Sequence, residues 1–185
     1  PPASAQFSFT ERGDLLSESS RSGAPIGIAD MNGDGLDDLV RLDETVRLMI
    51  DFQGVPGAPF TSHVHGVLPR TAMWALCIAD VDRNGFNDIF AGPSGGGILL
   101  LKADATGSSY LVEELPDRNI FGQGSIFADS DNDGNVDIFA TDDNEDNHRY
   151  RNDGAGRFIL EAALIDTSLP SGAGGNYAAM WTDYN

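Results

Sequence analysis

A chain of 185 residues is long enough for one domain with a hydrophobic core, and its 41% hydrophobic and 22% charged content is typical of a globular protein. The formal net charge of −18, from 29 acidic and 11 basic side chains, argues against binding to nucleic acid or insertion into an anionic membrane, and favours cations. The single cysteine, Cys77, excludes a disulfide within the chain, and no segment approaches the about 20 apolar residues of a membrane span.

The first expected element is an outer strand at Phe7-Ser8-Phe9, in residues 1–23. This run precedes the first acidic loop by the distance at which aromatic residues precede the later loops. We therefore assign residues 1–23 to the outer strand of a preceding blade, which in a closed ring is the last blade. Arg12-Gly13-Asp14 spells an integrin-recognition tripeptide. We interpret it as a turn and leave a functional role open.

Three acidic loops of one form follow, each flanked by apolar residues. They read Asp-x-(Asp/Asn)-x-(Asp/Asn)-Gly-x-x-Asp, and their first aspartates, Asp30, Asp80 and Asp129, lie 50 and 49 residues apart. Short β-like runs and turn-rich pieces separate the loops, and nothing sustains helical periodicity. A period near 50 with about four strands predicts an all-β, antiparallel β-propeller of four-stranded blades. In each blade the acidic loop joins the first two strands, and an aromatic residue 21 or 22 positions after the loop recurs at Phe60, Tyr110 and Phe158.

The repeat sets the expected boundaries. They are blade 1 at 24–72, blade 2 at 73–122, blade 3 at 123–176 and the start of blade 4 at 177–185, or about three and a half blades in one propeller segment. We expect the remainder of the ring to come from further chain of a longer protein or from a second subunit, and both alternatives stay open.

The acidic loops are the predicted metal sites. Side-chain oxygens at loop positions 1, 3, 5 and 9 converge when the chain curls, position 7 adds its backbone carbonyl, and glycine at position 6 permits the turn. Hard oxygen ligands favour Ca²⁺ over zinc or copper, with Mg²⁺ requiring stricter geometry. Ten carboxylates in three loops repel one another unless a cation is bound, which argues against plain acidic turns. The predicted ligands are Asp30, Asn32, Asp34, Leu36 and Asp38; Asp80, Asp82, Asn84, Phe86 and Asp88; Asp129, Asp131, Asp133, Asn135 and Asp137; and, in an incomplete fourth site, Asp183 and Asn185.

Weaker signals have structural interpretations. His63 and His65 share a strand face, but a zinc or copper site needs a third ligand, so we expect a surface strand. The basic run 148–151 is interpreted as an outward-facing strand paired with nearby acidic residues. Trp74 and Trp181 are expected to pack in the core or line a channel, with sugar stacking as the alternative.

The three loops, and the stretch 147–158 followed by 178–185, resemble FG-GAP/VCBS repeats, most closely those of cartilage-acidic-protein-like (ASPIC/UnbV-type) proteins. The family also includes integrin α-chain heads and propeller lectins. The resemblance covers nearly the whole chain. It implies a propeller, commonly seven-bladed, with one structural Ca²⁺ per motif-bearing blade.

The expected function is binding rather than catalysis. The clustered carboxylates are assigned to metal, and no nucleophile elbow, Cys/His pair or phosphate-binding loop occurs. We expect a secreted or cell-surface calcium-binding module for adhesion to a protein or carbohydrate, because millimolar extracellular calcium keeps such sites full. The alternative is the propeller of a polysaccharide-degrading enzyme of the lyase type.

Overall fold

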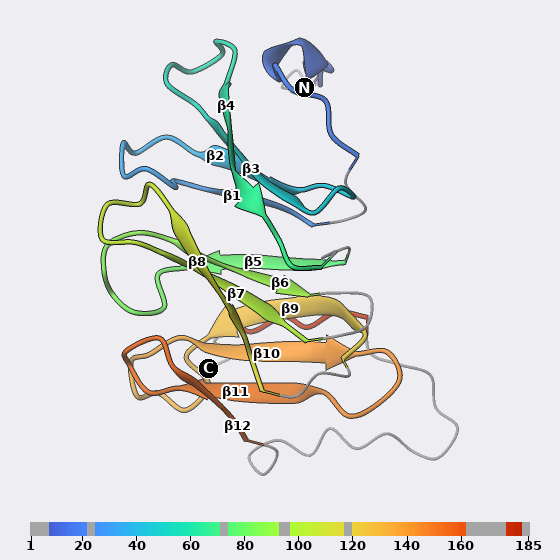
Figure 1. Cartoon of the computed structure of the whole chain (residues 1–185), viewed down its shortest axis with the longest axis vertical. Coiled ribbons are helices and arrows are strands. Elements are labelled where there is room, and N and C mark those ends of the chain that lie inside the picture. The colour runs from blue at the N-terminus through green and yellow to red at the C-terminus, as the bar shows by residue number, and fades with distance from the viewer. Residues whose placement is uncertain are drawn as a thin grey trace, which may run out of the picture.

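The computed structural model describes residues 8–21, 25–70, 74–92, 97–116, 120–161 and 177–182. Within these residues the protein is all-β, with three four-stranded antiparallel sheets stacked in chain order (Figure 1). A single 3₁₀ turn at Gly13–Leu15 is the only helical element in that part of the chain. In the part of the chain that the structure describes, no sheet closes on itself and the three sheets form no ring, so the propeller remains a prediction.

Each sheet is an antiparallel meander with neighbours in sequence order. Sheet 1 contains β1 (Ile26–Ala29), β2 (Asp38–Leu42), β3 (Arg47–Phe52) and β4 (Thr61–Val67). Sheet 2 contains β5 (Ala75–Ala79), β6 (Asp88–Gly92), β7 (Leu99–Ala103) and β8 (Tyr110–Glu114). Sheet 3 contains β9 (Gly122–Ala128), β10 (Asp137–Asp142), β11 (His148–Asn152) and β12 (Phe158–Leu160).

The repeated sequence features lie at equivalent places in the sheets. Each acidic loop joins the first two strands, as the spacing predicted. The recurring aromatic residue marks the start of the fourth strand, since Tyr110 opens β8, Phe158 opens β12 and Phe60 immediately precedes β4.

Two apolar layers hold the stack together. Between sheets 1 and 2, Leu48 and Ile50 belong to one buried cluster with Leu99 and Leu101. Between sheets 2 and 3, Leu100 belongs to a second cluster with residues of sheet 3 such as Ile138 and Tyr150. Because side chains alternate along a strand, β7 supplies both clusters, which explains why Leu99, Leu100 and Leu101 are all apolar.

The expected strand at the N-terminus is not formed by its described residues. Ser8 and Phe9 lie outside any strand and Phe9 is 98% exposed, whereas Phe7 lies outside the described residues. The segment 8–21 instead runs along the outward face of sheet 1, where the backbone of Leu15 accepts a hydrogen bond from the Phe60 N–H (2.8 Å). The predicted partner of this segment is a preceding blade, whereas each of the three sheets in the described residues takes its four strands from residues 26–160.

No helix in the described residues is long and apolar enough to cross a membrane.

Candidate metal centres

The three acidic loops adopt the same backbone path. The glycine at position 6 has positive φ in every loop: 82° at Gly35, 93° at Gly85 and 86° at Gly134. Position 4 is also left-handed, at Gly33, Arg83 and Asn132. A side chain is strained in this region, so the glycine at position 6 allows the loop to turn back on its first aspartate.

Backbone N–H groups orient the carboxylates at the start of each loop. The carboxylate at position 1 accepts hydrogen bonds from the N–H groups of positions 5 and 6, and the side chain at position 3 accepts one from position 5. In the second loop, the Asn84 N–H donates to Asp80 (3.1 Å) and Asp82 (3.2 Å), and the Gly85 N–H donates to Asp80 (2.9 Å). The first and third loops repeat these bonds.

The aspartate at position 9 fastens each loop to the third strand of its sheet. Asp38, Asp88 and Asp137 are buried, with at most 1% of their surface exposed. In each sheet, one oxygen of the position-9 carboxylate accepts a hydrogen bond from the backbone N–H of loop position 2. The other oxygen accepts one from the backbone N–H of the residue fifteen positions after that aspartate. The donor pairs are Met31 and Gln53 (both 2.9 Å), Val81 and Ala103 (both 2.8 Å), and Ser130 (3.3 Å) and Asn152 (2.9 Å).

The second loop brings three carboxylates together. One oxygen from each of Asp80, Asp82 and Asp88 lies within 4.8 Å of the others. Ligands around one Ca²⁺ sit at about 2.3–2.6 Å, so two of them are at most about 5 Å apart. The cluster therefore fits one ion of this size.

The third loop forms a second cluster from Asp129, Asp131 and Asp133, again with one oxygen of each within 4.8 Å of the others. Asp137, the predicted fourth carboxylate, is not part of this cluster. It is bonded by the Arg149 guanidinium (2.8 Å), which also bonds Asp131 (2.9 Å).

Sequence reasoning missed the role of Arg149. The run 148–151 was expected to face outward, but β11 lies between β10 and β12, and Arg149 is only 4% exposed. Burial alone lowers the pKa of Arg149, yet its bonds to Asp131 and Asp137 outweigh burial and raise it. No local signal distinguished this arginine from a surface residue, because its partners lie in a different loop.

The first loop differs from the other two. Asp30, Asp34 and Asp38 do not form a three-carboxylate cluster, and position 3 is Asn32, whose amide donates to Asp34 (3.2 Å). The structure therefore places its five predicted ligands in one loop without bringing three carboxylates together.

The remaining predicted ligands are placed only in part. The side chain at position 5 accepts a hydrogen bond from the backbone N–H of position 7 in every loop. In the second loop Asn84 accepts it from Phe86 (2.8 Å). The equivalent pairs are Asp34 with Leu36 and Asp133 with Asn135. Ligation by the carbonyls of these position-7 residues stays a prediction. Asp183 and Asn185 lie outside the described residues.

Burial and backbone bonds affect the loop carboxylates in opposite directions. Burial raises the pKa of Asp88 to about 6 and also raises that of Asp38. For Asp30 burial acts in the same direction, but the N–H groups of Gly35, Gly33 and Asp34 outweigh it and lower the pKa. A cation beside the buried position-9 carboxylate would offset the cost of keeping it ionised.

The weaker sequence signals lie outside these loops. His63 and His65 stack on one face of β4 (6.1 Å between ring centroids), and no third His, Cys, Asp or Glu of the described residues completes a cluster with them. Arg12 binds Asp14 within the same tripeptide (2.9 Å), at the 3₁₀ turn. Trp74 and Trp181 are 39% and 44% exposed, so neither belongs to the two cores.

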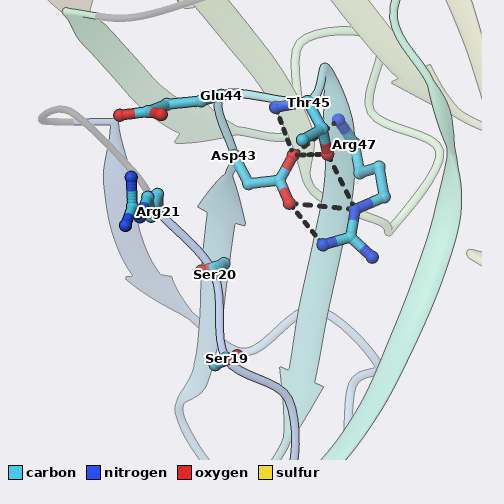
Figure 2. A pocket seen from close by; sticks show the side chains of 7 residues that line it. All are labelled: Ser19, Ser20, Arg21, Asp43, Glu44, Thr45 and Arg47. Carbon is cyan, nitrogen blue, oxygen red and sulfur yellow. Dashed lines mark hydrogen bonds and ion pairs between the residues drawn. The ribbon is translucent and has the colours of Figure 1, made fainter.

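A polar hollow of about 290 Å³ lies at the turn between β2 and β3, lined in part by Ser20 and Arg21 of the N-terminal segment. Figure 2 shows Asp43 pointing toward Thr45 and Arg47, with Glu44 extending to the other side. The Asp43 carboxylate is thus used to hold the turn together.

No protein-family model matches the chain, and no curated protein sequence is significantly similar to it.

Proposed function

We propose that this chain is an extracellular calcium-binding module of the FG-GAP/VCBS repeat type, part of a β-propeller, and that it binds a protein or carbohydrate partner. One observation carries the proposal: two three-carboxylate clusters of the right size for one ion occur at equivalent loops of sheets 2 and 3. In this proposal the ions are structural, and the chain is not an enzyme.

The proposed ion would act on the loops through its charge. In sheet 2 it would be held by Asp80, Asp82 and Asp88, and in sheet 3 by Asp129, Asp131 and Asp133. Calcium supplies a dication that offsets the repulsion among these carboxylates. The loop that it organises is already fastened to the third strand through position 9, so occupancy would stabilise the whole sheet.

Calcium binding is tested by isothermal titration calorimetry and by thermal melting in calcium, magnesium and EDTA. We expect the melting temperature to fall in EDTA, because an ion at about 100 times its dissociation constant stabilises by about 2.7 kcal/mol per site. An unchanged melting temperature in EDTA, together with no heat of binding, contradicts the proposal.

Matched variants locate the ion. The double variant Asp80→Asn/Asp82→Asn should remove one ion from the measured stoichiometry. The control Glu44→Gln removes a negative charge from an exposed residue outside the loops and should leave the stoichiometry unchanged. Equal loss of binding in both variants indicates a diffuse charge effect rather than a site.

Binding of a protein or carbohydrate partner is tested by a separate screen. A glycan array and a pull-down with the calcium-loaded chain test for binding. An assay for unsaturated uronate products, run in parallel on acidic polysaccharides, tests the lyase alternative. Reproducible turnover that survives removal of the loop carboxylates would refute the binding proposal.

A further inference from the structure

The second residue of an acidic loop connects neighbouring sheets. Met31 in the first loop is 1% exposed and belongs to the core between sheets 1 and 2, together with Ile89. Val81 in the second loop is 2% exposed and belongs to the core between sheets 2 and 3, together with Ile138. Each loop thus inserts an apolar side chain against the sheet that follows it.

The receiving sheet also binds the backbone of the inserted loop. The Asn87 amide donates to the carbonyl of Asp30 (2.8 Å), directly before Met31. The Asn152 amide donates to the carbonyl of Val81 itself (2.8 Å). The two interfaces therefore share an apolar contact and a side-chain amide bound to a loop carbonyl.

The outward face of sheet 1 has a cavity at the equivalent place, and none of the described residues is inserted in it as Met31 and Val81 are at the other two interfaces. We call it the socket, a cavity of about 370 Å³ lined by Ile28, Asp37, Asp38, Leu39, Gln53 and Phe60. Counted from the last loop aspartate, Leu39 corresponds to Ile89 and Ile138, which belong to the same clusters as the inserted residues. Phe60 corresponds to Tyr110 and Phe158, which belong to the same two clusters.

Two further positions complete the correspondence. Ile28 corresponds to Ile78 and Phe127, which are partly buried against the two cores, yet Ile28 is 69% exposed. Gln53 corresponds to Asn152, so its amide stands where a loop carbonyl is bound in sheet 3.

The N-terminal segment limits what can enter this face. Arg41 and Asp51 form a buried ion pair on it (2.6 Å), and Arg41 also donates to Ser20 (2.6 Å) and to the carbonyl of Glu18 (3.2 Å). The described part of the N-terminal segment, residues 8–21, therefore covers this part of the face, and none of its residues lines the socket.

The third loop of a second copy does not match the socket. Its second residue is Ser130, which bonds Asp137 and accepts a hydrogen bond from Arg149 (2.6 Å). Arg149 itself stands where sheets 1 and 2 carry the buried Ile50 and Leu100. The far face of sheet 3 is therefore polar at the place where the other sheets present an apolar side chain.

Resting on the repeat architecture proposed above, we propose that the socket binds the acidic loop of a further sheet of the same repeat, one that carries a large apolar residue directly after its first aspartate. The apolar side chain enters between Ile28, Leu39 and Phe60, and the Gln53 amide donates to the loop carbonyl. This contact does not depend on the identity of any bound ion.

The first test uses a hairpin peptide with the sequence of residues 26–42, cyclised through added terminal cysteines and confirmed as folded by NMR. Titrated into the isotopically labelled 185-residue chain, it should shift the resonances of Ile28, Leu39, Gln53 and Phe60. The Met31→Ser peptide should bind at least about ten-fold more weakly, because burying a methionine side chain contributes about 1.5–3 kcal/mol.

Variants of the chain locate the contact. Ile28→Lys should abolish peptide binding without unfolding the chain, since the side chain is exposed. Ile159→Lys, at a 48% exposed position of β12, is the matched control and should bind normally. No shifts with a folded peptide at millimolar concentration, or equal binding of the two peptides, would overturn the proposal.

A second test does not depend on the folding of a peptide. The double variant Ser130→Met/Arg149→Leu gives sheet 3 an apolar face like those of sheets 1 and 2. If circular dichroism shows it folded, sedimentation velocity should detect head-to-tail association that Ile28→Lys reverses. A folded double variant that stays as monomeric as the parent chain overturns the proposal. Self-association of the parent chain through Ile28 also overturns the proposal, because the socket would then bind a second copy of this chain.

Discussion

Removing the Asp88 side chain tests whether the position-9 aspartate holds its loop without any ion. Asp88 is fully buried, and its two oxygens accept the N–H groups of Val81 and Ala103, both at 2.8 Å. Asp88→Ala leaves both backbone donors buried without their acceptor. Asp88→Asn keeps one acceptor oxygen and turns an N–H toward the other donor.

The magnitude follows from two opposing effects. Each buried N–H left unsatisfied costs about 1–3 kcal/mol, so the alanine variant loses about 2–6 kcal/mol from this source. Burial, which raises the pKa of Asp88 to about 6, disfavours the carboxylate at neutral pH, and its removal offsets part of that loss. We expect a net destabilisation of about 2–4 kcal/mol for Asp88→Ala, with Asp88→Asn less affected.

The assay is urea unfolding at pH 7 in EDTA, which removes any contribution from a bound ion. Asp82→Ala is the matched control. Among the described residues this carboxylate of the same loop accepts one hydrogen bond, from the Asn84 N–H (3.2 Å), so its loss should cost less than about 1 kcal/mol. If Asp88→Ala unfolds within about 0.5 kcal/mol of the parent chain, the position-9 aspartate does not hold the loop and the reasoning fails.

Three further predictions concern other parts of the molecule. Burial tends to raise the pKa of Asp43, but hydrogen bonds from Arg47 and Thr45 lower it to about 2, so Asp43→Asn should destabilise by about 2 kcal/mol at pH 7. That difference, measured by urea unfolding, should shrink as the pH falls from about 4 toward 2, and a pH-independent difference contradicts this account. Burial raises the pKa of the Cys77 thiol to about 12, so a thiol reagent at pH 8 should react slowly with the folded chain and rapidly with the chain unfolded in urea. Equal reaction rates in the two states would refute the burial of this thiol. Gly85→Ala should destabilise the fold by about 1–2 kcal/mol, because Gly85 has a positive φ that strains an alanine. Gly54→Ala should have no such cost, because Gly54 has open space around it and no positive φ. Equal melting temperatures of the two variants would contradict backbone strain at position 85.

The sequence predicted the elements that depend on local spacing. Nearly equal distances between Asp30, Asp80 and Asp129 predicted three equivalent sheets, and the glycine at position 6 predicted a sharp turn between their first two strands. Short β-like runs between turn-rich pieces indicated the strands, because turn residues separate the short strands of an antiparallel sheet.

Features that depend on packing between distant segments were not predictable. Arg149 looks like a surface residue in the sequence, and only the position of β11 inside sheet 3 brings it to Asp131 and Asp137. The N-terminal strand was predicted from an aromatic spacing, but the described part of that segment, residues 8–21, lies outside any strand and contacts the outward face of sheet 1. The difference between the first and second loops depends on Asn32, which the motif treats as equivalent to aspartate.

The position-9 bonds also give each loop its own reporter for hydrogen exchange. The amide protons of Gln53, Ala103 and Asn152 each donate to one aspartate, and each of these aspartates belongs to a different loop. An amide exchanges with solvent only when its hydrogen bond opens, so its protection measures the local opening of that one loop. A single exchange experiment on three amides therefore resolves three loops whose behaviour is averaged together in a melting curve, and it ranks them by local stability without any substitution.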